Sequence, residues 1–197
     1  GHPRYSLTNT VTSGTSQIYV LTIFWTSTPS TVGKVTGVTY TGAPIPAMIS
    51  LVPMPVFPAA SNGYYAQIYY VMNPPAGTST VNIDFDVAPA GVAVGALNAD
   101  GVDPTTPIVG YGPVTATKPV TSLSRSLAIP ANGLAIDVLS RSSGGNTTGN
   151  ACADPLDPTV SLVSIYRSNA EKIAGQTSYC GPVSAGGLTY NMGYTFE

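Results

Sequence analysis

Apolar and polar residues alternate with a period of two along most of this chain, and short stretches rich in Gly, Pro and Asn interrupt the alternation. The pattern is typical of half-buried β-strands joined by turns. No window has the period of an amphipathic helix, and the nearest candidate, 168–174, is one turn at best. The candidate strands are 5–12, 17–26, 34–41, 46–52, 64–72, 78–87, 91–99, 123–129, 134–140, 160–167 and 188–197.

Short strands with regular turns predict an all-β fold, a two-sheet antiparallel β-sandwich of about ten strands with a jelly-roll-like arrangement. The length of 197 residues suits one domain. The chain has no internal repeat and no linker-like change of composition. We therefore expect an N-terminal segment over 1–12 and one sandwich domain over 13–197.

The surface of such a domain would carry few charges. Asp, Glu, Lys and Arg make up only 8% of the chain, against roughly 25% in an average soluble domain. Ser and Thr make up about a fifth, and the net charge is −2. With so little self-repulsion, the surface suits a protein that packs against copies of itself or carries glycan. A hydroxyl-rich extracellular domain that stays monomeric is the alternative. The seven basic residues are scattered, which argues against nucleic-acid binding.

Two features bear on location. The most apolar stretch, 47–60, contains Pro53, Pro55 and Pro58, which exclude a membrane-spanning helix. The chain begins with Gly1 instead of Met, as it would after removal of a signal peptide. We therefore expect an exported protein at the cell surface.

The only two cysteines, Cys152 and Cys180, lie in loop-like stretches near the ends of late candidate strands. An exported protein would hold them as a disulfide, which closes a loop of about 28 residues and stabilises by about 3–4 kcal/mol in the chain-entropy description. Two buried free thiols are the alternative. Since His2 is the only histidine and no CxxC motif occurs, a zinc site is not expected.

Catalytic groups are hard to assemble from this sequence. His2 lies in the N-terminal leader, where a Ser-His-Asp triad would need an implausible placement. Asp84 and Asp86 alternate with Ile83 and Phe85, so both carboxylates should share one sheet face, a spacing found in glycosidase strands. No Glu or Trp accompanies them in sequence, and a solvated face is the simpler interpretation. We expect no enzyme activity and no cofactor.

Two weaker site signals come from polar loops. Asn98, Asp100 and Asp103 could supply oxygen ligands to calcium, but the stretch does not match an EF-hand loop, and these residue types are ordinary turn formers. Asn146 begins an Asn-Thr-Thr glycosylation signal in the longest polar loop.

Aromatic residues could form a carbohydrate platform. Tyr64, Tyr65, Tyr69 and Tyr70 cluster on one candidate strand, and Trp25 is the only tryptophan. Because neighbouring positions point to opposite faces, two of the four tyrosines should be in the core and two exposed. Packing in a core or an interface explains them as well as sugar binding does.

The two ends of the chain have strand patterns. The C-terminal strand places one set of apolar residues on one face: Leu188, Tyr190, Met192, Tyr194 and Phe196. The N-terminal strand places Tyr5, Leu7 and Val11 on one face, where Asn9 interrupts them.

Three stretches resemble secreted jelly-roll modules of microbial surface proteins. KVTGVTYTGAPI (34–45) looks like their VTSVTYGG strand pair, YYVMNPPAGTSTVNIDF (69–85) like their WYLxNPPAGTxTVTVTF hairpin, and GVAVGALNADGVDPTTPI (91–108) like their AGAASFSGVDQTTPI segment. The resemblance covers 16–197 and implies the fold; it says little about function, because such modules occur in many contexts.

The resemblance also implies a missing element. In those modules a strand like 188–196 is followed by one more apolar strand, whereas this sequence stops at Glu197. An open groove and an unpaired edge would result, which a strand from a neighbouring copy could fill. Subunits of pili and threads of archaea and bacteria that assemble by donor-strand complementation are similar in composition. We expect 1–12 to be the donor and 188–196 the acceptor edge, with pairing of 5–11 inside its own domain as the alternative.

These observations predict a structural subunit of an extracellular filament or pilus, a homopolymer joined head-to-tail by strand exchange. A lectin-like or adhesin module that binds glycans or other cell-surface components is the first alternative. A jelly-roll virion or tail component is the second.

Overall fold

The computed structural model describes residues 3–28, 33–41, 49–50, 63–110, 121–142, 147–151, 161–168, 173–183 and 188–196. These residues form thirteen strands, and every strand pairing is antiparallel, which confirms the all-β sandwich class. Within this described part, no helix is long and apolar enough to cross a membrane.

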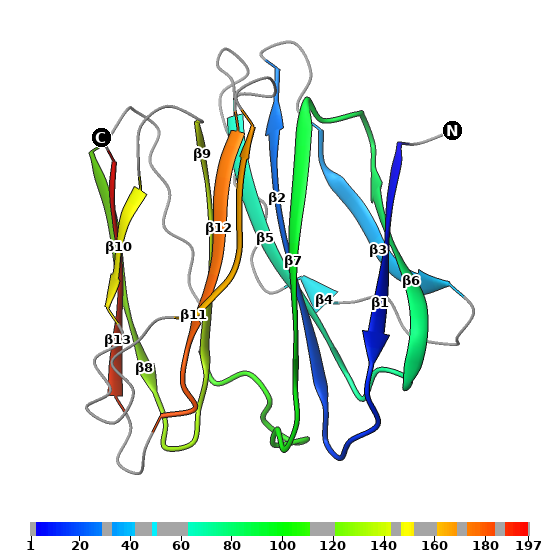
Figure 1. Cartoon of the computed structure of the whole chain (residues 1–197), viewed down its shortest axis with the longest axis vertical. Helices are drawn as coiled ribbons and strands as arrows, with labels where there is room; N and C mark the ends of the chain where they lie inside the picture. Colours follow the sequence, from blue (N-terminus) through cyan, green and yellow to red (C-terminus); the bar gives the residue numbers. More distant parts are fainter. Residues whose placement is uncertain are drawn as a thin grey trace. The chain divides into compact units, whose positions relative to one another are not determined.

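The strands fall into two compact units, Gly1–Val109 and Gly110–Glu197, each with two sheets (Figure 1). The expectation of one domain over 13–197 is therefore wrong. Strand alternation is alike in both units, and no change of composition marks residue 110, so the sequence carried no signal for the boundary.

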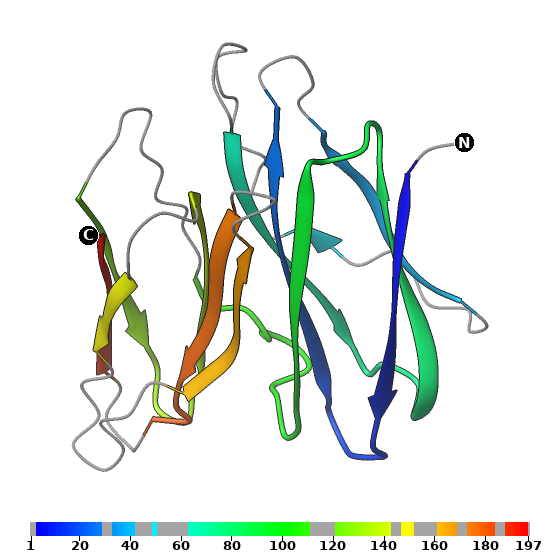
Figure 2. The ribbon, with the colours of Figure 1, turned by 45° about the horizontal axis from the view of Figure 1, so that its top comes forward.

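Unit 1 contains a three-stranded sheet and a four-stranded sheet. Sheet A has the order β1-β6-β3, and sheet B has the order β4-β5-β2-β7. Both views of the ribbon show the two sheets face to face (Figures 1 and 2). The strands are β1 (Arg4–Val11), β2 (Ile18–Ser27), β3 (Val35–Thr41), β4 (Ile49–Ser50), β5 (Gly63–Met72), β6 (Gly77–Phe85) and β7 (Gly91–Ala99).

The core of unit 1 lies between these sheets. Alternate residues of each strand point inward, as a pleated strand requires. The buried cluster consists of Tyr19, Leu21, Ile23 and Trp25 from β2, Val38 from β3, Tyr65, Tyr69 and Val71 from β5, and Val81, Ile83 and Phe85 from β6.

β2 is the central strand of unit 1, paired with β5 on one side and β7 on the other. All ten of its residues are buried, in keeping with its nearly continuous apolar sequence. Trp25 stacks on Tyr65 at 5.3 Å between ring centroids and meets Phe85 edge-on at 5.6 Å. The Trp25 indole N–H donates to the backbone oxygen of Gly33 at 3.0 Å, so the one polar atom of this side chain is satisfied.

Unit 2 contains two three-stranded sheets, with the orders β10-β13-β8 and β11-β12-β9. Asp137 of β9 and Ser178 of β12 are both buried, and the serine hydroxyl donates to the carboxylate at 2.5 Å. The strands are β8 (Ser122–Ile129), β9 (Ala135–Ser142), β10 (Thr147–Ala151), β11 (Ser161–Ser168), β12 (Ile173–Cys180) and β13 (Leu188–Phe196).

The sequence pattern missed two of these strands, β10 and β12. β12 buries Thr177 and Ser178, which are neighbours on opposite faces, so its polar and apolar residues do not alternate. Backbone pairing to β9 and β11 defines this strand, and polar buried positions conceal it from a pattern search.

Replacing Leu21 by Ala should lower the free energy of unfolding of unit 1 by about 2–5 kcal/mol, because Leu21 is fully buried in the core cluster. Urea unfolding followed by the fluorescence of Trp25, the only tryptophan, measures this change. The control, Val87→Ala, removes a side chain that is 40% exposed and should cost less than about 1 kcal/mol. Equal losses in both variants would contradict the described core.

Candidate functional site

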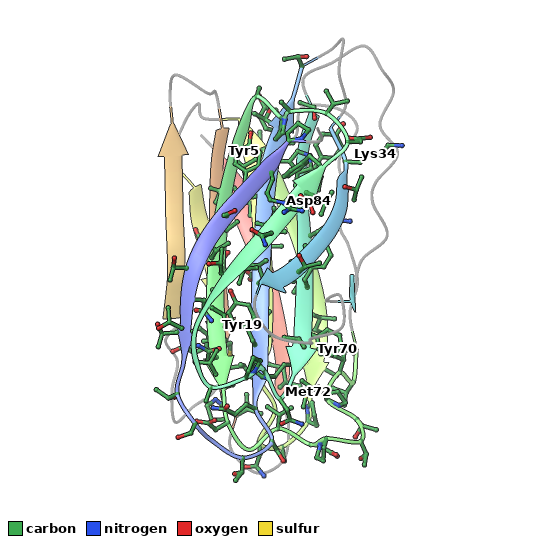
Figure 3. The ribbon with its side chains drawn as sticks, turned by 90° about the vertical axis from the view of Figure 1, so that its right-hand side faces the viewer. Tyr5, Tyr19, Lys34, Tyr70, Met72 and Asp84 are labelled. Atoms are coloured by element: carbon green, nitrogen blue, oxygen red, sulfur yellow. The ribbon has the colours of Figure 1, made fainter. Side chains whose placement is uncertain are left out.

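β1 forms the edge of sheet A. It pairs with β6 from Arg4 opposite Asp84 to Val11 opposite Gly77, and no other described strand pairs with it. Figure 3 looks onto this sheet and shows Tyr5 on β1 and Asp84 on β6 near the end at which the chain begins. Thr8, Thr10 and Val11 are β-branched and favour the extended backbone that this pairing needs. β1 is the strand that the sequence analysis predicts to be exchanged between copies.

The inward face of β1 contacts the core only in part. Val11 is 2% exposed, and Leu7 packs half-buried against the core cluster. Tyr5 meets Phe85 edge-on at 5.6 Å but remains 37% exposed. Asn9 shares this face and replaces an apolar contact with an amide. β1 therefore buries much less apolar surface than the central strands do.

The outward face of β1 is held by polar contacts to β6. Arg4 donates twice to Asp84, at 2.6 Å and 3.0 Å. The Ser6 hydroxyl donates to the Asn82 side-chain oxygen at 2.8 Å, and the hydroxyls of Thr10 and Thr78 lie 3.0 Å apart. The Arg4–Asp84 ion pair is exposed, and ion pairs of this kind contribute little to stability.

Two amide groups at the β1–β6 pair are buried without a hydrogen-bond partner. They are the side-chain Nδ2 atoms of Asn9 on β1 and Asn82 on β6. A buried donor that finds no acceptor costs about 1–3 kcal/mol. Together they offset much of the stabilisation that Val11 and Leu7 provide by burial, about 1.5–3 kcal/mol for a fully buried side chain. The side chains of β1 therefore add little net free energy to the backbone ladder that pairs β1 with β6.

The loop 12–17 connects β1 to β2 and is tied to neighbouring loops. Gln17 is buried, and its side-chain nitrogen donates to the Thr12 oxygen at 2.8 Å and to Asp100 at 2.6 Å. Gly101 N–H donates to the Thr15 oxygen at 3.1 Å. Gly14 approaches this cluster so closely that an added Cβ would overlap the side chains of Asp100 and Gln17. The part of the loop from Thr15 to Gln17 is held by hydrogen bonds to neighbouring loops. The part next to β1 has one side-chain hydrogen bond, from Gln17 to the Thr12 oxygen.

The structure bears differently on the predicted donor strand, 1–12, and on the predicted acceptor edge, 188–196. Residues 4–11 pair with β6 in sheet A of the same chain, so the structure of a single chain shows the alternative, pairing of 5–11 inside its own domain. Exchange of this segment between copies stays a prediction. The acceptor edge 188–196 is wrong: β13 lies between β10 and β8, and both of its sides are paired over much of its length. The inference that a closing strand is missing beside 188–196 failed because β10 pairs with β13 there.

The four tyrosines divide between two faces as predicted. Tyr65 and Tyr69 are buried in the core, and Tyr64 and Tyr70 are half-buried on the other face of β5. Trp25 is fully buried, so it belongs to the core and not to a surface platform.

The paired carboxylates have structural partners. Ile83 and Phe85 are fully buried, so the alternation along β6 is as predicted, but both carboxylates are half-buried. Asp84 forms the ion pair with Arg4. Asp86 accepts the backbone N–H groups of Lys34 at 2.6 Å and of Val87 at 2.8 Å, and so closes the end of the β6 strand.

The calcium candidate uses its oxygens internally. Asp103 accepts the hydroxyl and N–H groups of Thr105 and Thr106, which hold the pKa of its carboxyl group well below the usual range. Asp100 accepts from Gln17, and Asn98 is exposed. Within the described part of the chain, no group of three or more His, Cys, Asp and Glu side chains could hold a metal ion.

Cys180 ends β12 and is 1% exposed. Cys152, Asn146 and His2 lie outside the described residues. The pairing of Cys152 with Cys180 therefore stays a prediction, as does glycosylation of Asn146.

Sequence reasoning missed the contributions of Gln17 and Asn82. Both are buried polar residues at positions where the alternation predicts solvent exposure or a turn. The sequence around a Gln or Asn beside an apolar strand does not show whether its side chain is buried. Their importance comes from the loops and strands that pack over them.

Comparison with known proteins finds no family model, no curated protein and no solved structure that matches this chain.

Replacing Asn9 by Leu should raise the free energy of unfolding of unit 1 by about 1–3 kcal/mol, because it removes a buried unpaired amide and adds an apolar contact on the inward face. The converse variant, Leu7→Asn, should lower it by a similar amount. Urea unfolding with Trp25 fluorescence measures both. A destabilised Asn9→Leu variant would show that the amide is satisfied and that β1 is held more firmly than described.

Non-reducing peptide mapping should recover the peptides of Cys152 and Cys180 as one linked species. Reduction should lower the melting temperature of the protein while far-UV circular dichroism at room temperature keeps its β-sheet signal, because the bridge closes only a loop of unit 2. Two thiols that react with an alkylating reagent in the native protein would rule the bond out.

Proposed function

We propose that this protein is a structural, non-enzymatic subunit of an extracellular filament at the cell surface, and that copies assemble by exchange of β1. In the assembly, β1 of one copy lies on β6 of the next. The observation that carries the proposal is the weakly held edge strand: β1 is paired on one side, buries little apolar surface and leaves two amides without partners.

Exchange of an identical strand is a low-cost route to assembly. Every contact that β1 makes with β6 in one chain is available to β1 of another copy, so the contact energy is conserved and only the opening must be overcome. The donor (β1) and the acceptor (β6) are different surfaces, so successive copies can continue the chain without closing it.

The uncharged surface supports self-packing. Beyond the Arg4–Asp84 pair, the outward face of β1 and β6 presents hydroxyl side chains: Ser6, Thr8, Thr10, Thr78 and Thr80. Such a face has no net charge to repel a neighbouring copy. A disulfide between Cys152 and Cys180, which the sequence predicts, would fit export, since disulfides persist in oxidising compartments.

The rival carbohydrate-binding function has less support. A sugar platform needs exposed aromatic rings, whereas Trp25, Tyr65 and Tyr69 are buried. Among the residues whose burial the structure describes, Tyr5 is the most exposed aromatic side chain, and the other aromatic ring that it contacts, Phe85, is buried.

Cysteine pairs across β1 and β6 test the proposal. Thr10 and Thr78 are register partners whose hydroxyls lie 3.0 Å apart on the outward face. Two full-length variants, Thr10→Cys and Thr78→Cys, are mixed, allowed to assemble and oxidised. Exchange predicts a disulfide between the two different chains, identified by mass spectrometry.

The control replaces the second variant by Thr36→Cys, a position within β3 at the register irregularity between Val35 and Gly37, which does not face Thr10. This mixture should give no specific cross-link. A protein that assembles without any Thr10–Thr78 bond between chains, or that never assembles, would refute the proposal.

A further inference from the structure

Unit 1 has two distinct ends. At the loop end, the connections 12–17, 73–76 and 100–106 lie together: Asn73 N–H donates to the Gln17 oxygen at 2.7 Å, and Val102 N–H donates to the Ser16 oxygen at 2.9 Å. At the far end, Asp86 and Lys34 join the start of β3 to the end of β6. β1 runs from the far end, at Arg4, to the loop end, at Val11.

The contacts between β1 and β6 have a direction. The Arg4–Asp84 ion pair, the Ser6–Asn82 hydrogen bond and the Thr10–Thr78 contact all require antiparallel strands in one register. A reversed strand would place Arg4 at the Gly77 end and lose the ion pair. A strand supplied by another copy therefore keeps Val11 at the loop end of the copy that receives it.

The hinge that must span the two copies is short. Six residues separate Val11, the last residue of β1, from Ile18, the first of β2. Seven steps of about 3.3–3.6 Å reach roughly 25 Å when fully extended. If Gly101 and Val102 keep their bonds to the loop, only the four steps from Val11 to Thr15 are free, which reach about 14 Å.

The sandwich is longer than this hinge. β2 has ten residues, and at about 3.3 Å each it runs roughly 30 Å from the loop end to the far end. A stack in which the loop end of one copy meets the far end of the next would put Val11 too far from its own Ile18. The hinge therefore excludes such a stack for a strand that keeps its register.

We infer that assembly brings the loop ends of consecutive copies together, so that the partner of the loop end is the loop end of a second copy of this chain. The inference rests on the proposed exchange of β1 and adds its geometry. Each copy donates β1 from its loop end and receives β1 with Val11 at its loop end. Both events place the surface formed by residues 12–17, 73–76 and 100–106 at the junction.

Spin labels on two matched alanines test this arrangement. Ala76 is exposed in the loop end, and Ala88 is exposed in the far end, between β6 and β7. Full-length Ala76→Cys and Ala88→Cys proteins are labelled, diluted with unlabelled protein and assembled. Pulsed dipolar spectroscopy should give a shorter distance between neighbouring copies for the Ala76 label than for the Ala88 label. Pro104→Cys and Ala90→Cys, exposed at the same two ends, repeat the comparison should a first variant misfold.

The outcomes separate the inference from the function on which it rests. A distance for Ala88 that equals or falls below that for Ala76, in assemblies that contain the Thr10–Thr78 cross-link between chains, overturns the inference and leaves strand exchange standing. Assemblies without that cross-link remove both. A shorter Ala76 distance together with the cross-link supports both.

Discussion

β6 contributes Val81, Ile83 and Phe85 to the core of unit 1, and all three are fully buried. A strand that carries this much of a core is held in sheet A between β1 and β3, with backbone pairing on both of its sides. β3 joins through a register with one irregularity, between Val35 and Gly37, whereas β1 pairs along eight residues without a break. The requirement that β6 be paired on the β1 side is the constraint on which unit 1 depends. Any strand with the sequence of β1 can meet it.

β6 needs a paired strand on this side, but that strand can come from its own chain or from another copy. The backbone ladder is regular, so it is equally good whichever copy provides the strand. The side chains of β1 add little beyond it, since Tyr5 is partly exposed and Asn9 and Asn82 leave amides unpaired. Strands of low local stability are those that open most readily. A firm requirement for a strand, met by a loosely held strand, is the physical basis of the proposed assembly.

The class of fold was predictable because apolar and polar residues alternate along a strand in step with their burial and exposure. The patterns of β1, β2, β5, β6 and β7 all lie within a residue or two of the predicted ranges. The sequence pattern did not predict the division into two units or the strands β10 and β12. β12 buries polar residues such as Ser178, whose hydrogen bond to Asp137 joins it to β9, 41 positions earlier in the chain, and no local pattern records that contact.

The candidate site was predictable in part. The alternation of Tyr5, Leu7 and Val11, with Asn9 as an interruption, identified β1 as a strand with an incomplete apolar face, and the structure places it at a sheet edge. The strand that pairs with β1 could not be found from sequence, because which strand lies beside β1 depends on topology. β6 and β13 have equally strand-like patterns, and only the order of strands shows that β13 is central.

The most direct measurement of strand exchange is a density map of the assembled filament at a resolution that shows the connection between β1 and β2. The strand on β6 should lead through the loop 12–17 into β2 of a neighbouring copy, with Arg4 beside the neighbour's Asp84. A continuous chain from that strand into β2 of the same copy, throughout the filament, would contradict the exchange and the function proposed from it.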